Sequence, residues 1–276
     1  MQIKYSCSYW GNDQFSPKTF IEKVSKSGYN GVELFLQPMD HITIEFMEAI
    51  SEIRKENPDF YLIALQLTVP VKESVDSYII KMEKTLESLS VLNPLFINSH
   101  TGKDHYSFDD NCRVIEACLN FSQKKGIRIL HETHRGRFAF HTTTLQSYLK
   151  KFPELELVGD FSHFCVVSES MLEDQEEILS NIIPHVGHIH ARVGFEQSPQ
   201  VNDPAAPEWQ QHFDRFMGWW KLIAEHNKNK GKNILTFTPE FGPIPYMPLE
   251  PFTQKPLSNM WDNNIYMLRK LKETFC

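Results

Sequence analysis

The chain alternates short apolar runs with longer amphipathic stretches, and this alternation continues over all 276 residues. The apolar runs are rich in β-branched and aromatic residues, which is typical of buried strands. The predicted strands are Ile3–Ser8, Gly31–Leu36, Phe60–Leu67, Leu95–His100, Ile127–His134, Leu155–Phe161, Val186–Arg192 and Ile234–Phe241. The predicted helices are Pro17–Ser27, Ile42–Glu56, Val75–Leu92, Phe108–Lys125, Thr144–Lys151, Leu172–Ile183, Glu208–Asn229 and Leu257–Phe275. Strands and helices that alternate in this way form a parallel sheet, because each crossover needs a helix to return the chain.

The number of strand–helix pairs favours a closed barrel over an open sheet. Eight pairs without a break in composition match the eight strands and eight helices of a TIM barrel. An open doubly wound sheet usually carries a glycine-rich phosphate-binding turn, and neither G-x-G-x-x-G nor G-x-x-x-x-G-K-[ST] occurs in the sequence. We therefore predict an α/β fold, a single (β/α)8 TIM barrel, with one domain over residues 1–276.

Charge, hydropathy and cysteine content disfavour several other classes. The chain has 28 Lys and Arg against 35 Asp and Glu, a net charge of −7, so no nucleic-acid partner is expected. No apolar run approaches the ~18 residues that span a bilayer, and the start lacks the apolar core of a signal peptide. Five scattered cysteines without a C-x-x-C pair argue against a zinc ribbon or a disulfide framework. We expect a cytoplasmic protein without a membrane partner, and a homo-oligomer stays open.

The last four predicted strands each end in residue types that bind metal ions. The strand ends read His131-Glu132-Thr133-His134, Asp160-Phe161-Ser162-His163, His188-Ile189-His190-Ala191-Arg192 and Pro239-Glu240. In a TIM barrel these ends meet at the C-terminal mouth, where the active sites of such enzymes lie. The long polar segment Val193–Pro207 follows the seventh strand, and we expect it to cover that mouth.

Strand alternation predicts that Glu132, Asp160, His190 and Glu240 point inward together. Three carboxylates at one place repel one another, and a divalent cation removes that repulsion. Carboxylate oxygens with one imidazole suit Mn²⁺, Mg²⁺ or Zn²⁺. We therefore predict one divalent metal ion with these four ligands. The alternative is structural pairing of the carboxylates with an arginine, either Arg192 or Arg135.

The order Glu, Asp-x-x-His, His-x-His, Glu over these strand ends resembles the xylose isomerase-like TIM-barrel superfamily. This sugar phosphate isomerase/epimerase group includes ketose 3-epimerases, hydroxypyruvate isomerase, inosose dehydratase and endonuclease IV. The resemblance implies metal ligands at Glu132, Asp160, His190 and Glu240. It also implies that His163, the histidine of Asp-x-x-His, contacts the substrate and not the metal.

Two departures from the family pattern narrow the choice of reaction. Endonuclease IV-like enzymes need further histidines on early strands for three zinc ions, and Phe60–Leu67 offers none. His100 on the fourth strand supplies only one. Phe138 stands where ketose 3-epimerases have a glutamate that grips the substrate, which argues against simple ketohexose 3-epimerisation.

The predicted function is metal-dependent isomerisation or epimerisation of a sugar or sugar derivative through an enediolate. A divalent ion would hold the carbonyl and a neighbouring hydroxyl, and Glu132 and Glu240 would remove and return the proton. The predicted substrate-binding residues are His163, His100, Arg192, His188 and Trp10. Two alternatives stay open, namely a lyase or dehydratase on the same metal scaffold and an endonuclease IV-like phosphodiesterase.

Overall fold

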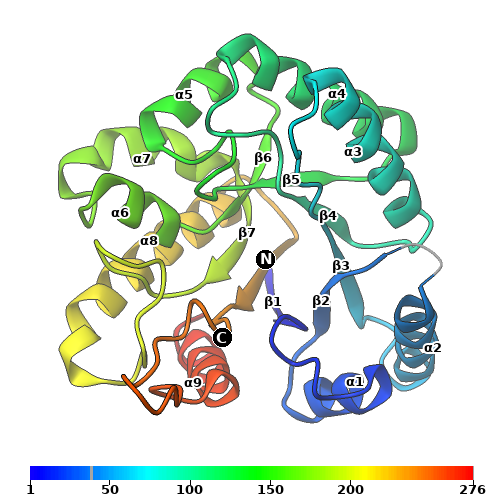
Figure 1. Cartoon of the computed structure of the whole chain (residues 1–276). Coiled ribbons are helices and arrows are strands. Elements are labelled where there is room, and N and C mark those ends of the chain that lie inside the picture. Colours follow the sequence, from blue (N-terminus) through cyan, green and yellow to red (C-terminus); the bar gives the residue numbers. More distant parts are fainter. Residues whose placement is uncertain (38–39, 276) are drawn as a thin grey trace. The chain divides into compact units, whose positions relative to one another are not determined.

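The computed structural model describes residues 1–37 and 40–275 (Figure 1). In the described chain, eight parallel strands pair in chain order, and β8 pairs with β1 to close the barrel. The strands are β1 (Gln2–Ser8), β2 (Gly31–Phe35), β3 (Tyr61–Gln66), β4 (Phe96–Ser99), β5 (Ile129–Glu132), β6 (Glu156–Gly159), β7 (Val186–Ala191) and β8 (Ile234–Pro239). The predicted (β/α)8 barrel is confirmed.

The predicted helices are present in the predicted order, with one further helix, α6, after β6. They are α1 (Pro17–Lys26), α2 (His41–Glu56), α3 (Val75–Ser90), α4 (Phe108–Lys125), α5 (Thr142–Lys151), α6 (Ser162–Ser168), α7 (Glu176–Ile182), α8 (Gln210–Asn229) and α9 (Met260–Phe275). Short 3-10 helices cover Glu173–Gln175, Ile183–His185 and Pro207–Trp209. None of the described helices combines the length and the apolar character that a bilayer-spanning segment requires.

By its internal contacts the chain divides into two compact units. The early unit comprises Ser6–Glu132 and Gly136–Ala139, and the late unit comprises Met1–Tyr5, Thr133–Arg135 and Phe140–Cys276. Strand β1 contributes to both, since its first residues pair with β8 and its last residues pair with β2. The assignment of the whole chain to one domain stays a prediction.

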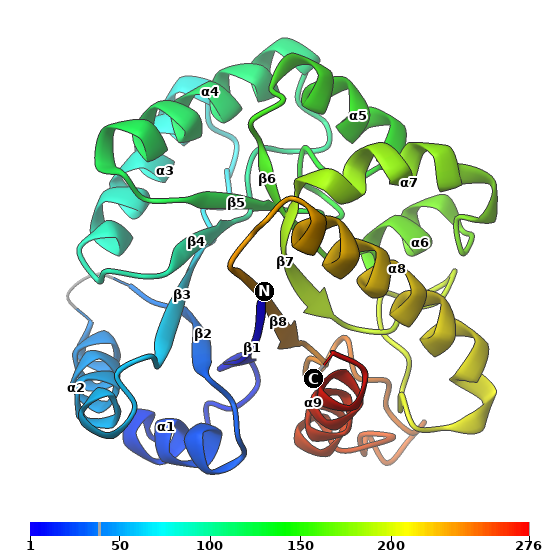
Figure 2. The ribbon, with the colours of Figure 1, turned by 180° about the vertical axis from the view of Figure 1, so that it is seen from behind.

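In the early unit, the helix ends follow local sequence signals. Ser16 precedes α1 and its hydroxyl accepts a hydrogen bond from the Thr19 amide, while Pro17 occupies the first turn. Helix α4 ends at Gly126, whose φ of 68° is a left-handed conformation that a glycine adopts without strain. Helices α1 and α2 lie side by side (Figures 1 and 2).

In the late unit, the register of β7 and β8 places two histidines opposite two threonines. His188 pairs with Thr236 and His190 with Thr238, so both histidines lie on one face of the sheet. The sequence predicts β6 to continue to Phe161, but the strand ends at Gly159 and α6 begins within three residues. This helix was not predicted, because it has only seven residues and no side-chain cap.

Candidate active site

A late cluster, which we define as Asp160, His163, His190, Arg192 and Glu240, contains three of the predicted metal ligands. Potential ligand atoms of Asp160, His190 and Glu240 all lie within 4.8 Å of one another. The Nδ1 atom of His190 is 2.9 Å from Oε2 of Glu240. Asp160 is fully buried, whereas 13% of the Glu240 side chain is exposed. The sequence prediction that these three residues lie close together therefore agrees with the structure of the late unit.

The backbone around Asp160 is fixed by its neighbours. The Thr133 hydroxyl donates to the Asp160 carbonyl at 2.9 Å and accepts from the Asp160 amide at 2.8 Å. The carboxylate accepts a hydrogen bond on Oδ1 from the Ser162 amide at 3.1 Å, and another from the Ser162 hydroxyl. These bonds hold the carboxylate at the start of α6 with Oδ2 directed at its other partners.

Arg192 supplies a cation within the late cluster. Its guanidinium is buried and forms an ion pair with Oδ2 of Asp160. It also lies 3.6 Å from Oε2 of Glu240 and 3.0 Å from Nε2 of His163. The structural pairing that the sequence left open is thus present, and it involves two of the predicted metal ligands. Asp160 and Glu240 already lie beside one cation, the Arg192 guanidinium. Their charge and spacing therefore also suit a metal cation.

The late unit also contains site residues that sequence reasoning missed. Tyr246, from the proline-rich segment after β8, has its ring centroid 4.8 Å from the Arg192 guanidinium and 5.2 Å from that of Arg135. Burial raises the pKa of Tyr246, and the two arginines oppose that shift. The His134 ring contacts the His163 ring at a tilt of 48°, with 3.9 Å between the ring centroids.

His188 contacts the neighbouring strand through both ring nitrogens. Its Nδ1 atom is 2.6 Å from the Thr236 hydroxyl, and its Nε2 atom is 3.1 Å from the Thr238 hydroxyl. The ring is buried and lies 5.3 Å from the ring of His190, centroid to centroid. These contacts stabilise the histidine pair on β7, and the predicted substrate contact of His188 stays a prediction.

An early cluster, which we define as Glu33, Asn98, His100 and Glu132, lies in the early unit. The Asn98 amide nitrogen donates to Oε1 of Glu33 and to Oε2 of Glu132, both at 2.9 Å. The Nε2 atom of His100 is 2.8 Å from the same oxygen of Glu132. Both carboxylates are buried, and Asn98 Oδ1 has no hydrogen-bond partner among the described residues. Two buried carboxylates that share one neutral donor form an environment that favours a nearby cation.

Glu33 and Asn98 were not among the predicted site residues. The signal was present, since Glu33 is the one polar side chain of β2 and Asn98 follows the apolar pair Phe96 and Ile97 on β4. The metal-ligand prediction rested on the ends of the last four strands, and on the earlier strands it singled out only His100, so it passed over Glu33 and Asn98.

The opposite side of β5 carries a neutral histidine. His131 Nδ1 is 2.7 Å from the Thr101 hydroxyl, and its ring packs edge to face on Phe138. Burial lowers the pKa of His131 to about 4, so the imidazole is uncharged at neutral pH. Phe138 is likewise buried.

Trp10, a predicted substrate-binding residue, is 39% exposed and lies in the loop after β1.

The segment after β7 is fixed to the segment after β8. The Gln200 side chain accepts from the Gly242 amide at 2.7 Å and donates to the Gly242 carbonyl at 3.2 Å. Asn202 accepts at its carbonyl from the side chains of Ser258 and Asn263. The segment Val193–Pro207, which was predicted to cover the mouth, is therefore packed against the segment after β8 within the late unit. Its part in enclosing a substrate stays a prediction.

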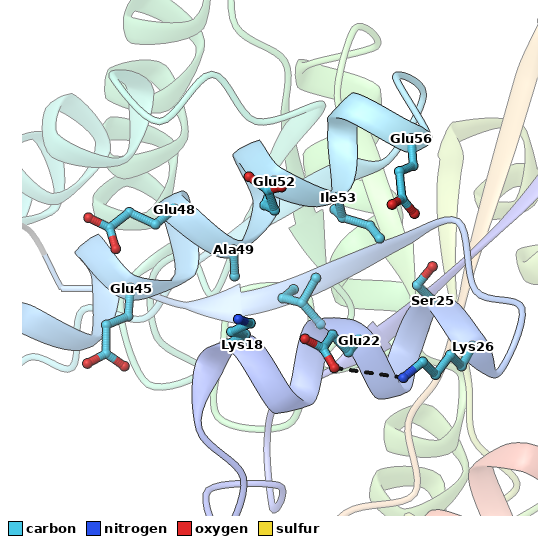
Figure 3. Close-up of a pocket in the computed structure, with 11 residues that line it drawn as sticks. Lys18, Glu22, Ser25, Lys26, Glu45, Glu48, Ala49, Glu52, Ile53 and Glu56 are labelled. Atoms are coloured by element: carbon cyan, nitrogen blue, oxygen red, sulfur yellow. Dashed lines mark ion pairs between the residues drawn. The ribbon is translucent and has the colours of Figure 1, made fainter.

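A groove of about 720 Å³ lies between α1 and α2 in the early unit (Figure 3). It is lined by Lys18, Ile21, Glu22, Ser25, Lys26, Glu45, Glu48, Ala49, Glu52, Ile53 and Glu56. The charged side chains lie along its rim, and Glu22 pairs with Lys26 at 3.8 Å. The lining has no histidine, cysteine or buried charged group, so we assign no chemistry to this groove.

Comparison with known proteins supports the fold. No protein-family model matches the sequence, and no curated protein matches it either. A xylose isomerase-like TIM barrel protein from Mycobacterium smegmatis, in complex with magnesium, has a TM-score of 0.60 and 10% identity over 99% of this chain and 98% of its own. The probable 3-DHS dehydratase of petrobactin synthesis from Bacillus anthracis has a TM-score of 0.62 and 14% identity over 98% of each chain. The 3-keto-D-glucoside 4-epimerase of E. coli has a TM-score of 0.58 and 11% identity over 99% of this chain and all of its own.

These comparisons define the class to which the fold belongs. The chain shares its barrel fold with these solved structures, one of which is described as a xylose isomerase-like TIM barrel protein, the group that its strand ends resemble. Solved structures with this fold include enzymes that act on small molecules and a protein with bound magnesium.

Proposed function

We propose that this protein is a divalent-metal-dependent enzyme that isomerises or epimerises a sugar or sugar derivative. The proposal is carried by the late cluster, in which two carboxylates and one imidazole offer ligand atoms within 4.8 Å of one another. Buried carboxylates and an imidazole suit Mn²⁺, Mg²⁺ or Zn²⁺. Structural neighbours with epimerase activity and with bound magnesium support the same assignment.

The proposed metal ligands are Glu132, Asp160, His190 and Glu240. Glu132 is adjacent in the chain to Thr133, whose hydroxyl is bonded to the backbone of Asp160. A divalent ion held by these residues would supply positive charge that stabilises negative charge developing on a substrate oxygen.

Glu132 and Glu240 are the proposed proton carriers. Asn98 and His100 both contact Oε2 of Glu132, which fixes the orientation of this carboxylate. Glu240 is partly exposed, and His190 lies beside its Oε2. Each glutamate would remove or return the proton on the substrate carbon. His163, His100, Arg192, His188 and Trp10 are the proposed substrate-binding residues.

Dehydration is the second candidate reaction, and a dehydratase among the structural neighbours favours it. Both reactions begin with removal of a proton next to a carbonyl, so the same residues would serve either. They differ in the second step, because a dehydratase expels a hydroxyl and an epimerase returns the proton.

The first experiment measures metal content and then proton exchange. The purified protein should bind one equivalent of Mn²⁺, Mg²⁺ or Zn²⁺, and the loaded enzyme should exchange a substrate C–H for deuterium in D₂O across a panel of sugars. Exchange without water loss indicates an isomerase or epimerase, whereas an unsaturated product indicates a dehydratase. A protein that binds no divalent ion would contradict the proposal.

Substitution of the glutamates separates proton transfer from metal binding. Glu132→Gln and Glu240→Gln should each lower kcat by ~10²–10⁴-fold, because an amide keeps an oxygen but accepts no proton at neutral pH. Asp160→Asn should lower metal affinity first, so excess Mn²⁺ should restore part of its activity. Full rescue of the glutamate variants by excess metal would show that both glutamates are only ligands.

A further inference from the structure

Two arginines of the late unit lie against one tyrosine ring beside the late cluster. The guanidinium carbons of Arg192 and Arg135 are both within 5.2 Å of the Tyr246 ring centroid. The Tyr246 hydroxyl is 3.5 Å from Nε2 of His134. Two permanent positive charges and a hydroxyl donor at one ring form a combination that attracts an anion.

The two arginines differ in their present partners. Arg192 is buried and paired with Asp160, with Glu240 near by. Arg135 is exposed, and no carboxylate among the described residues forms an ion pair with it. Its charge therefore faces solvent next to the late cluster.

Binding of a metal ion would change the balance of charge around Arg192. If Asp160 and Glu240 held a divalent ion, Arg192 would share both carboxylates with that ion. A buried guanidinium needs a compensating negative charge, and the adjacent Arg135 adds a second positive one. A substrate that carries its own negative charge restores the balance.

We propose that Arg135, Arg192 and Tyr246 form a subsite that binds a carboxylate or phosphate group of the substrate. This inference rests on the proposed function and narrows its substrates to sugar acids or sugar phosphates. Guanidinium groups match both anions because they offer paired donors in one plane. Burial keeps the pKa of Tyr246 above its usual range, so its hydroxyl stays protonated and donates a further hydrogen bond.

Calorimetric titration of the Mn²⁺-loaded protein tests the subsite with three probes, namely D-glycerate, glycerol and inorganic phosphate. Because the metal itself attracts anions, the test is the effect of Arg135→Gln. This variant should keep the affinity for Mn²⁺ and lose about tenfold or more in affinity for the preferred anion. Whichever of glycerate and phosphate binds more tightly identifies the anionic group.

Arg269→Gln is the matched control. Arg269 is exposed on α9, and its guanidinium lies 5.5 Å from the Tyr266 ring, so it repeats the arginine–tyrosine contact elsewhere. This variant should bind all three probes as the wild type does. Equal anion affinity in Arg135→Gln and Arg269→Gln would overturn the subsite.

A metal-free measurement separates this inference from the proposed function. Asp160→Asn removes the charge that holds Arg192, while the amide oxygen can still accept from Ser162. Without metal, this variant should bind the preferred anion about tenfold more tightly than the metal-free wild type. If the wild type binds no metal and the variant still gains anion affinity, the subsite stands without the proposed function. Metal binding without that gain would overturn the subsite alone.

Discussion

The early and late clusters stabilise their buried carboxylates in different ways. In the late cluster, Asp160 is paired with the Arg192 guanidinium, which neutralises its charge. In the early cluster, Glu33 and Glu132 share the neutral amide of Asn98. The late cluster therefore contains a permanent positive charge of its own chain, whereas the Asn98 amide supplies hydrogen bonds but no charge to the early cluster. A divalent ion bound by Asp160 and Glu240 would therefore share these carboxylates with Arg192.

Removal of the Arg192 guanidinium from the late cluster should have the largest effect on stability. Arg192→Met leaves Asp160 buried without its charged partner, so the free energy of unfolding of the metal-free protein should fall by about 3–5 kcal/mol. Urea unfolding measures this change. Excess Mn²⁺ should recover part of it, because a cation again faces Asp160. Arg269→Met on the exposed face of α9 serves as the control, and a loss below 1 kcal/mol in both variants would break the comparison.

Removal of the Asn98 amide, which donates hydrogen bonds in the early cluster, should have a smaller effect on stability. Asn98→Leu takes one amide from two buried carboxylates and should lower the free energy of unfolding by about 2–3 kcal/mol. The matched control is Asn263→Leu, since Asn263 is also buried but donates to the uncharged atoms Asn202 O and Ser258 Oγ. We expect about 1 kcal/mol for that control. Equal losses would mean that the early carboxylates add no electrostatic cost.

The smallest effect concerns the neutral histidine on the other side of β5. The pKa of His131 is lowered from 6.5 to about 4, so between pH 8 and pH 5 the unfolded chain gains a proton that the native protein does not. Stability should therefore fall by about 2 kcal/mol as the pH drops over this range.

His131→Asn should flatten this pH dependence. His105→Asn, at a side chain that is 69% exposed, should leave it unchanged. Urea unfolding at several pH values measures both. A variant of His131 that keeps the wild-type slope would show that another group titrates.

Most of the fold could be predicted from the sequence, because apolar runs predict the strands and long amphipathic stretches predict the helices. The prediction of α4 has the observed bounds, Phe108–Lys125, since a serine cap and a terminal glycine mark its ends. The strands were predicted too long, as at β5, where Ile127–His134 exceeds the observed Ile129–Glu132. The excess residues at β5, Arg128, Thr133 and His134 among them, can also adopt an extended conformation, so sequence alone does not give the first and last paired residues.

The site could be predicted only in part. Asp160, His190 and Glu240 follow from their positions at strand ends, which meet at one mouth of a barrel. Tyr246 lies in a proline-rich segment without a period, so nothing local predicts its place beside Arg192. Glu33 could have been predicted from the sequence, because it is the single carboxylate in an otherwise apolar strand.

The bond between Gln200 and Gly242 has a consequence for protein engineering. One side-chain amide both accepts from and donates to a single residue's backbone, so the segments after β7 and β8 are joined as two strands would be. A transplant of one segment from a related barrel would leave its partner's amide and carbonyl unmatched. Designs that aim at a new substrate should therefore exchange these two segments as a pair.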